Sequence, residues 1–270
     1  MTTRTLAHAI GFTEGPLWTS TGRLLVTSMS RGLLYEVSLA GAEPAVAAET
    51  GGGPNGLAED ATGVVFVAQN GNATIQSRSL RPVEAGIQAL LGTEVRDAVG
   101  GCTAPNDCAV GPGGRLWFTD PPGRVCTFDP RSGAVAETIV GVGFPNGLAF
   151  ADEETLLLAD TETHRILRYR CDVGSAREAG VFAELPGTGP DGIAVDRDGR
   201  LYVAAFETNE VIVLDPGGVV EERIQLPGAR PTNLCFAGEA LDVLVVTCAS
   251  GGRVLAFEDR FPGRRPQALA

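Results

Sequence analysis

The sequence is poor in the residues that build several common catalytic centres, and it has no long apolar run. Only two histidines are present, His8 and His164, and neither lies in the repeated motif described below. A histidine-based zinc site and a Ser-His-Asp triad are therefore not expected. No stretch of about 18 apolar residues occurs, so no membrane-spanning segment is predicted.

Cysteine and positive charge are also limited in informative ways. None of the six cysteines forms a Cys-x-x-Cys pair, and three of them lie inside apolar runs, so buried free thiols are expected. The formal net charge of −12 argues against a nucleic-acid partner, because phosphate binding requires a positive surface. The N-terminus lacks a long apolar segment and a small-residue cleavage site. We therefore expect a cytoplasmic protein, monomeric or weakly homo-oligomeric, that acts on a small molecule.

Glycine and proline are abundant, at 36 and 17 residues, and they separate short apolar runs at regular intervals. Six units share one pattern, in which a polar residue near proline or glycine precedes an apolar strand. The apolar residue that opens this strand lies at positions 17, 57, 108, 148, 193 and 234. A period of about 40 to 50 residues containing several short strands is typical of one propeller blade.

The contents of each unit predict an all-β fold. Short runs rich in β-branched and aromatic residues follow the first strand of each unit, as in Leu116-Trp117-Phe118 and Val125-Cys126-Thr127-Phe128, and no helical apolar period is sustained. In the second unit the third strand is expected at 73–76. The longest interval contains 96–104, which we expect to form an insert over the channel mouth.

These features predict one domain over 1–270, a six-bladed β-propeller of four-stranded antiparallel blades. The sixth unit lacks a fourth strand, and Phe261-Pro262-Gly263 is poor strand material. Residues 4–10 resemble the missing strand. We therefore expect the N-terminal strand to join the last blade and close the ring, which removes an exposed edge.

A polar side chain opens each inner strand and is expected at one mouth of the central channel. Carboxylate and amide oxygens are the ligands that hard divalent cations prefer, and a cation would offset two carboxylates brought together there. The same sequences also suit ordinary turns, in which Asn or Asp caps the backbone and glycine adopts a positive φ. Two departures from turn preferences, Glu14 and the Asp107 that follows Asn106, favour the metal interpretation. The six positions are Glu14, Asn55, Asn106, Asn146, Asp191 and either Thr232 or Asn233.

The motifs resemble those of the SMP-30/gluconolactonase/luciferin-regenerating enzyme (regucalcin-like) family. The resemblance extends from about residue 11 to residue 258 and lies in the motifs Glu14-Gly15-Pro16, Pro105-Asn106-Asp107, Leu116-Trp117-Phe118-Thr119-Asp120-Pro121, Pro145-Asn146-Gly147 and Pro190-Asp191-Gly192. It implies a six-bladed propeller with one divalent cation, for which calcium is favoured and Mg, Mn, Zn and Fe(II) are alternatives. The implied ligands are Glu14, Asn146 and Asp191, with Asn106 as a fourth ligand or a substrate contact.

The resemblance also implies hydrolysis of a small lactone, with one departure. Sugar-lactone members carry an arginine two residues before the third-motif Asn, where this chain has Ala104. We therefore expect Thr103 and Ala104, with Asn55 and Asn106, to shape a substrate site different from theirs. Asp191 is the expected general base toward an attacking water. The alternatives are an esterase or phosphotriesterase, a non-hydrolytic biosynthetic step on the same site, and a non-catalytic binding propeller.

Overall fold

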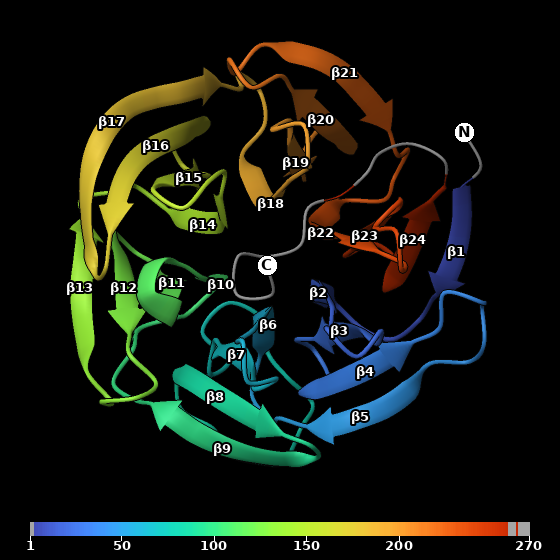
Figure 1. The fold of residues 1–270 in the computed structure, drawn as a ribbon. Helices are drawn as coiled ribbons and strands as arrows, with labels where there is room; N and C mark the ends of the chain where they lie inside the picture. The colour runs from blue at the N-terminus through green and yellow to red at the C-terminus, as the bar shows by residue number, and fades with distance from the viewer. Residues whose placement is uncertain (1–2, 259–262, 264–270) are drawn as a thin grey trace.

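Six four-stranded antiparallel sheets are arranged in a ring around a central axis, as Figure 1 shows. Side chains of the six innermost strands line the central channel along this axis. The structure is a computed structural model, and it describes residues 3–258 and residue 263. The innermost strand of each sheet faces the channel and the outermost strand lies at the periphery. The predicted all-β six-bladed propeller is confirmed, and the only helical element in the described residues is the short 3-10 helix η1 (Pro112–Gly114).

The blades follow the chain in order, and each is built of consecutive strands except the last. Blade 1 contains β2 (Thr13–Trp18), β3 (Leu24–Ser28), β4 (Leu33–Val37) and β5 (Ala45–Glu49). Blade 2 contains β6 (Pro54–Glu59), β7 (Val65–Gln69), β8 (Gly86–Leu91) and β9 (Glu94–Val99). Blade 3 contains β10 (Cys108–Val110), β11 (Leu116–Asp120), β12 (Arg124–Phe128) and β13 (Val135–Val140).

The second half of the ring repeats this order. Blade 4 contains β14 (Pro145–Phe150), β15 (Thr155–Asp160), β16 (Arg165–Asp172) and β17 (Ser175–Glu184). Blade 5 contains β18 (Pro190–Val195), β19 (Leu201–Ala205), β20 (Glu210–Leu214) and β21 (Val220–Gln225). Blade 6 contains β22 (Pro231–Ala237), β23 (Val243–Cys248), β24 (Arg253–Phe257) and the N-terminal strand β1 (Thr3–Ala7).

The N-terminal strand closes the ring, as the sequence predicts. Strand β1 pairs antiparallel with β24, with Thr3 opposite Phe257 and Thr5 opposite Leu255. Arg4 adds an ion pair with Glu258 beside this pairing, its Nε lying 2.8 Å from the Glu258 carboxylate. The outer edge of β24 is therefore covered by a strand more than 240 residues away in sequence, and Figure 1 shows β1 beside β24.

The core consists of six apolar clusters, one between each pair of neighbouring blades. Successive side chains of a strand point to opposite faces, so one strand supplies two clusters. In β11, Trp117 packs toward blade 4 and Phe118 toward blade 2, and both are fully buried. The Trp117 ring meets Phe150 edge-on at 5.6 Å between centroids. This alternation explains why the middle strands are apolar along their whole length.

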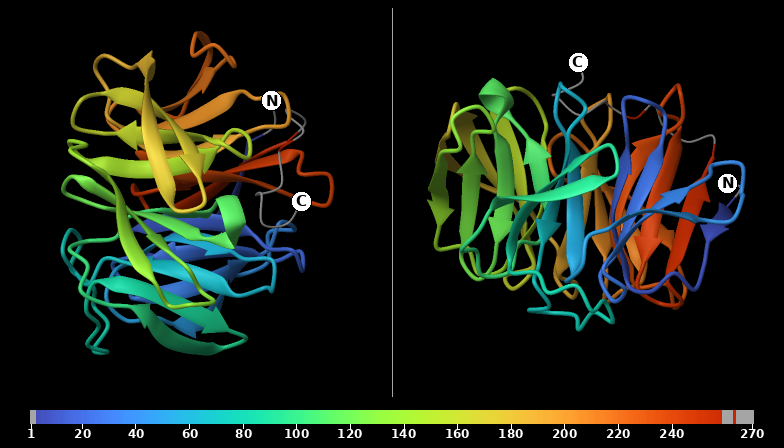
Figure 2. Two further views of the ribbon diagram at one scale, coloured as in Figure 1. Left: turned by 60° about the vertical axis from the view of Figure 1, so that its left-hand side comes forward. Right: turned by 90° about the horizontal axis from the view of Figure 1, so that it is seen from below.

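Two strand-level predictions in blade 2 are wrong. Residues 73–76 do not form its third strand, which is β8. Of the expected insert at 96–104, residues 96–99 belong instead to the outer strand β9, and only 100–104 form a loop that leads to Asn106. The extra length of this unit lies instead in the loop between β7 and β8, which projects from the face opposite η1 (Figure 2). Hydrogen bonds from the Thr74 N–H to the Asn70 side-chain oxygen and from the Arg78 N–H to the Ser30 carbonyl hold this loop. The predicted poor strand material at Phe261-Pro262 lies outside the described residues, while Gly263 forms one antiparallel bridge with Asp196.

Candidate active site

The predicted site residues lie at the start of the inner strands, and the motifs are not turns. Pro54, Pro145 and Pro190 are the first residues of β6, β14 and β18. In each case the pairing with the next strand skips a register before the following apolar residue, as between Pro145 and Leu148. Such a bulge re-aims the side chain that it contains. We call the end of the channel at which the inner strands begin the site mouth.

A glycine follows the polar residue in four blades, and at Gly56 and Gly147 it is required by close packing between blades rather than by turn geometry. A Cβ on Gly147 would lie 2.5 Å from the Asp191 carbonyl oxygen, and one on Gly56 would lie 2.1 Å from an Asp107 carboxylate oxygen. Neither of these two glycines has a positive φ, whereas Gly15 does, at 41°. The expectation that these glycines relax a turn is therefore wrong for Gly56 and Gly147. Their role is to let neighbouring inner strands approach at the channel.

Two carboxylates at the site mouth, Glu14 and Asp191, both have raised pKa values. Burial raises the Glu14 pKa well above its usual value, and the Asp191 charge raises it further. Burial also raises the pKa of Asp191, while the Asn146 side chain lowers it as a hydrogen-bond donor and the Asp107 charge raises it. Glu14 is 4% exposed, and Asp191 remains partly accessible. The negative charge of Asp191 therefore disfavours the ionised form of Glu14.

Asn146 is held with its carbonyl oxygen free. Its Nδ2 donates to Thr161 Oγ1 at 3.1 Å, and Thr161 Oγ1 in turn donates to the Pro190 carbonyl at 2.6 Å. The Asn146 Oδ1 atom is buried and has no hydrogen-bond partner in the part of the chain that the structure describes. Because Thr161 fixes which end of the amide is occupied, the oxygen is left as an acceptor without a donor. The same hydroxyl links blade 4 to the residue that precedes Asp191.

The remaining predicted positions lie beside these groups. Asn55 is 2% exposed, and its Oδ1 atom is likewise buried without a partner among the described residues. Asn106 is 9% exposed, and its N–H donates to the Thr119 carbonyl. Thr103 and Ala104 precede it, and their N–H groups donate to the buried Asp120 carboxylate at 2.9 Å and 2.7 Å. Asp120 is in turn paired with Arg124, so this approach to Asn106 is firmly held.

Blade 6 departs from the pattern, and the structure separates its two candidates. The Thr232 hydroxyl is turned into the wall, where it donates to the Thr13 carbonyl at 2.8 Å. The next residue, Asn233, lines the channel and lies near both acidic groups: its Nδ2 is 3.4 Å from an Asp107 carboxylate oxygen, and its side chain lowers the Glu14 pKa as a hydrogen-bond donor. Asn233 is therefore the blade 6 residue that faces the predicted site.

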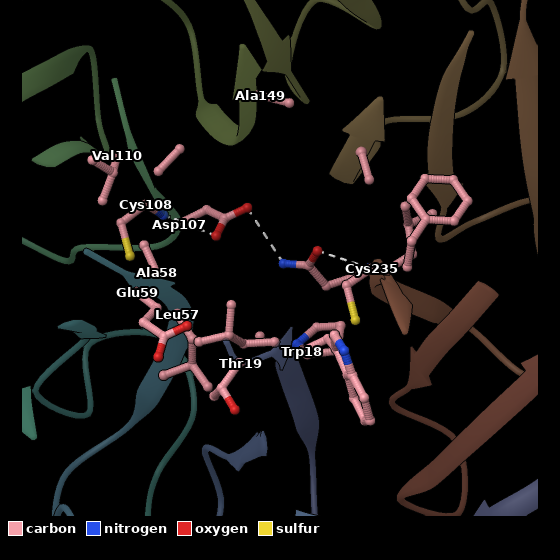
Figure 3. Close-up of a pocket in the computed structure, with 18 of the residues that line it drawn as sticks. Trp18, Thr19, Leu57, Ala58, Glu59, Asp107, Cys108, Val110, Ala149 and Cys235 are labelled. Carbon is pink, nitrogen blue, oxygen red and sulfur yellow. Dashed lines mark hydrogen bonds between the residues drawn. The ribbon is translucent and has the colours of Figure 1, made fainter. Parts of the chain in front are cut away.

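A cavity of about 420 Å³ lies behind these residues, on the side away from the site mouth. Its lining begins at Gly15, Asp107 and Asn233 and continues along apolar inner-strand residues to Glu59. Figure 3 shows Asp107 at one side of this cavity, with a dashed line to the Asn233 amide, and Trp18, Cys108 and Cys235 on its walls. We call it the rear cavity. Trp117 is fully buried in the core, whereas Trp18 is only partly buried and lines this cavity.

The donor set fits a hard divalent cation. Buried acceptor oxygens without donors are costly unless a ligand satisfies them, and Asn55 and Asn146 each present one. Two carboxylates with raised pKa values gain from a nearby cation, and the set contains only oxygen atoms. In residues 3–258 and 263, no three His, Cys, Asp or Glu side chains form a group able to hold a metal. A metal site here therefore requires amide oxygens as ligands in addition to the two carboxylates.

Two residues that support this site, Thr161 and Glu207, are not among the candidates named from the sequence. Both are polar residues just after the second strands of blades 4 and 5. Glu207 accepts from the Gly189 N–H at 2.9 Å and raises the pKa of Asp191 by its charge. The signal available was the repeat itself, since aligned units place a polar residue at the end of several second strands. All six cysteines are free thiols, as expected; four are buried, and Cys102 and Cys235 are partly buried.

Comparison with known proteins places the chain in a family. The model of the SMP-30/Gluconolactonase/LRE-like region matches residues 12–250. A pentonolactonase from Haloferax volcanii is 37% identical over 155 residues, covering 55% of this chain and 48% of that protein. A 6-deoxy-6-sulfogluconolactonase from Pseudomonas putida is 34% identical over 163 residues, 55% of each chain. The chain thus matches about half the length of these relatives.

The fold agrees over nearly the whole chain. A gluconolactonase structure from Xanthomonas campestris superposes with a TM-score of 0.81 and 24% identity, covering 95% of this chain and 89% of that one. No helix in the described residues is long and apolar enough to cross a membrane. Because the family model spans most of the sequence and the propeller matches, the chain belongs to the SMP-30/gluconolactonase/LRE-like family.

Proposed function

We propose that this protein is a divalent-metal-dependent lactonase whose site lies at the site mouth. The observation that carries the proposal is the convergence of Glu14, Asp191 and the donor-free oxygen of Asn146 at one end of the channel. The relatives named for lactone hydrolysis support the reaction class. The oxygen-only donor set favours calcium over softer metals, with Mg, Mn, Zn and Fe(II) as alternatives to be tested.

The residues that would hold the cation are Glu14, Asn146 and Asp191, with Asn106 as the fourth. A bound divalent cation supplies Lewis acidity toward the lactone carbonyl and offsets negative charge that develops on its oxygen. Thr161 keeps the Asn146 amide turned so that its oxygen remains available. The inner-strand bulges and the close glycine contacts fix the backbone of these ligands before any substrate binds.

Asp191 is proposed as the general base. It is the partly accessible member of the carboxylate pair, so water can reach it, and a carboxylate can accept a proton from that water. In the forward step the water oxygen bonds to the carbonyl carbon while one water proton passes to Asp191. The bond between that carbon and the ring oxygen then breaks, and the proton from Asp191 completes the leaving hydroxyl. Lactone and water yield one hydroxy acid.

Substrate orientation is proposed for Asn55 and Asn106 at the channel and for Thr103 and Ala104 at the rim. The second unpartnered amide oxygen, Asn55 Oδ1, can accept a hydrogen bond from a substrate hydroxyl. Ala104, whose N–H is held by Asp120, offers a methyl group where sugar-lactone members carry an arginine. This difference favours a substrate that is substituted differently on that side from a simple aldonolactone.

The test uses the full chain, freed of metal with a chelator and reloaded with Ca, Mg, Mn or Zn. Hydrolysis of a panel of lactones, carboxylic esters and phosphotriesters is followed by proton release. We expect lactone turnover that is lost with chelator, restored by metal, and absent in Glu14→Gln and Asp191→Asn. Full activity in both variants would refute the site, and turnover confined to phosphotriesters would favour the phosphotriesterase alternative. A metal that raises Tm without any turnover would favour a binding propeller.

A further inference from the structure

One position of the repeat carries a charge in only one blade, and it lies at the rim of the site mouth. The residue two before each inner-strand polar position is uncharged in five blades and is Arg230 in blade 6. The rear cavity begins one or two residues after these polar positions, so we infer that the residues two before them lie on the opposite side, toward the rim of the site mouth. The five uncharged residues are Phe12, Gly53, Ala104, Phe144 and Gly189.

The Arg230 backbone is held in an unusual conformation. Its φ is 51°, in the left-handed region that costs a bulky residue energy. Its N–H donates to Asn209 Oδ1 at 3.0 Å, and its carbonyl accepts from the Ala249 N–H at 2.9 Å. Glycine would adopt this φ at lower cost, so packing does not explain an arginine here. Strain that the surroundings impose on an exposed charged residue is typical of a functional position.

The Arg230 guanidinium is ordered by an aromatic ring, and no carboxylate among the described residues pairs with it. Its guanidinium lies over the Phe206 ring, 5.3 Å from the centroid, and the residue is exposed. Among residues 3–258 and 263 no carboxylate lies within ion-pair distance of it, whereas nine other arginines have such partners. Stacking on an aromatic ring orders the planar group and leaves its N–H donors free.

The charge of the site mouth makes this arginine significant. Glu14, Asp191 and Glu207 are all acidic, and the sequence contains no lysine that might balance them. A cation held by Glu14 and Asp191 would be committed to the reacting carbonyl. Any second negative group on a substrate would then need a separate positive partner at the rim, and a single guanidinium presents the paired N–H donors that match one carboxylate.

We propose that Arg230 is a specificity-determining residue that binds a carboxylate on the substrate, so that the preferred substrates are lactones carrying a free carboxylate outside the ring. This inference rests on the proposed lactonase function and adds the substrate class to it. Arg230 takes no part in bond breaking. Its contribution is made on binding, and it should therefore appear in KM more than in kcat.

The experiment compares two substrates that differ by one carboxylate, D-glucono-1,4-lactone and D-glucaro-1,4-lactone, in the metal-loaded full chain. We expect Arg230→Gln to raise KM for the glucarolactone at least tenfold, with kcat and the KM for the neutral lactone changed less than twofold. The wild-type preference should also fall in 0.5 M salt, because exposed charges are screened. Arg96→Gln is the matched control: it removes one positive charge from the outer strand β9, and both KM values should stay unchanged.

Failure of this inference is distinct from failure of the lactonase proposal. If Arg230→Gln leaves both KM values unchanged, or raises them equally, the carboxylate role is refuted while lactone turnover stands. If wild-type protein hydrolyses no lactone, the ring-opened dianion D-glucarate is titrated calorimetrically into wild type and Arg230→Gln. A tenfold or greater loss of affinity in the variant supports the anion site, and equal or undetectable binding in both overturns it.

Discussion

Asn233 of blade 6 donates a hydrogen bond to Asp107 of blade 3 from the opposite side of the channel, with 3.4 Å between nitrogen and oxygen. These two residues occupy the same position of the repeat, directly after the polar residue that opens the inner strand. In the other four blades this position is glycine, at 15, 56, 147 and 192. The blades that lack the glycine therefore supply the pair that separates the site mouth from the rear cavity.

This pair predicts a measurable coupling between residues 126 positions apart in sequence. Burial raises the pKa of Asp107 to about 6, and Asn233 is one of the hydrogen-bond donors that oppose this rise. Removing the donor leaves a buried carboxylate less satisfied, so Asn233→Ala should lower the free energy of unfolding by about 1–3 kcal/mol. A urea-unfolding cycle of Asp107→Ala, Asn233→Ala and the double variant should show coupling above about 0.5 kcal/mol. Additive effects would mean that the contact contributes nothing to stability.

A second prediction concerns the glycines that remain. A Cβ on Gly147 would meet three backbone atoms of blade 5 within 2.8 Å, the Asp191 carbonyl oxygen among them. Backbone cannot rotate away, so Gly147→Ala should destabilise the protein by at least about 2 kcal/mol. Gly100→Ala is the control, because Gly100 has neither a positive φ nor any atom within 4 Å of the added Cβ. Thermal unfolding of both variants decides the matter, and equal Tm values would refute the close-packing account.

Much of this architecture was predictable because the repeat is a property of the sequence. Apolar alternation in runs such as 116–118 identifies the strands, and the missing fourth strand of the last unit pointed to closure by β1. The strand prediction that failed concerns one local segment. The third strand of blade 2 was expected at 73–76, directly after its neighbour, but polar residues there cap a long loop through Asn70 and Asn72 side chains. Local hydrogen bonding of Asn overrode the weak apolar signal.

The polar positions of the candidate site could be identified from the sequence, but the contacts that support them could not. Positions such as Glu14 and Asp191 are visible because the repeat aligns them. Contacts between blades are not visible in this way, and the Thr161 bond to the Pro190 carbonyl joins two blades through a hydroxyl whose sequence context is an ordinary polar turn. Likewise the interpretation of Pro-Asn-Gly as a turn assumed local geometry, whereas the next blade's backbone dictates the glycine.

Thr161 supplies a third prediction. Its hydroxyl oxygen accepts a hydrogen bond from the Asn146 Nδ2, so the Asn146 Oδ1 is the atom that faces the proposed metal site. Thr161→Val keeps the shape but removes this partner, so the amide can turn and calcium affinity should fall about 10- to 100-fold, as for other supports of metal ligands. Isothermal titration of the metal-free protein with calcium measures this. Thr161→Ser should restore the affinity, and a loss that serine fails to rescue would indicate a packing effect instead.

The last prediction concerns Cys102, which lies next to Thr103 at the rim and is only partly buried. Desolvation first, and then the charge of Asp120, raises the pKa of its thiol to about 12. A raised thiol pKa keeps the group protonated at pH 8, and alkylation requires the thiolate. A pKa raised by three units lowers the thiolate fraction about 10³-fold. A more basic thiolate is also more nucleophilic, which offsets part of this loss, so iodoacetamide should react about 30- to 100-fold more slowly than with free cysteine.

The alkylation rate of Cys102 should still be rising with pH at pH 10, since deprotonation is far from complete there. Peptide mass spectrometry after timed alkylation measures it, and Asp120→Asn should accelerate the reaction by removing one of the charges that oppose thiolate formation. A rate that already levels off near pH 9 would show that neither burial nor Asp120 acts on this thiol.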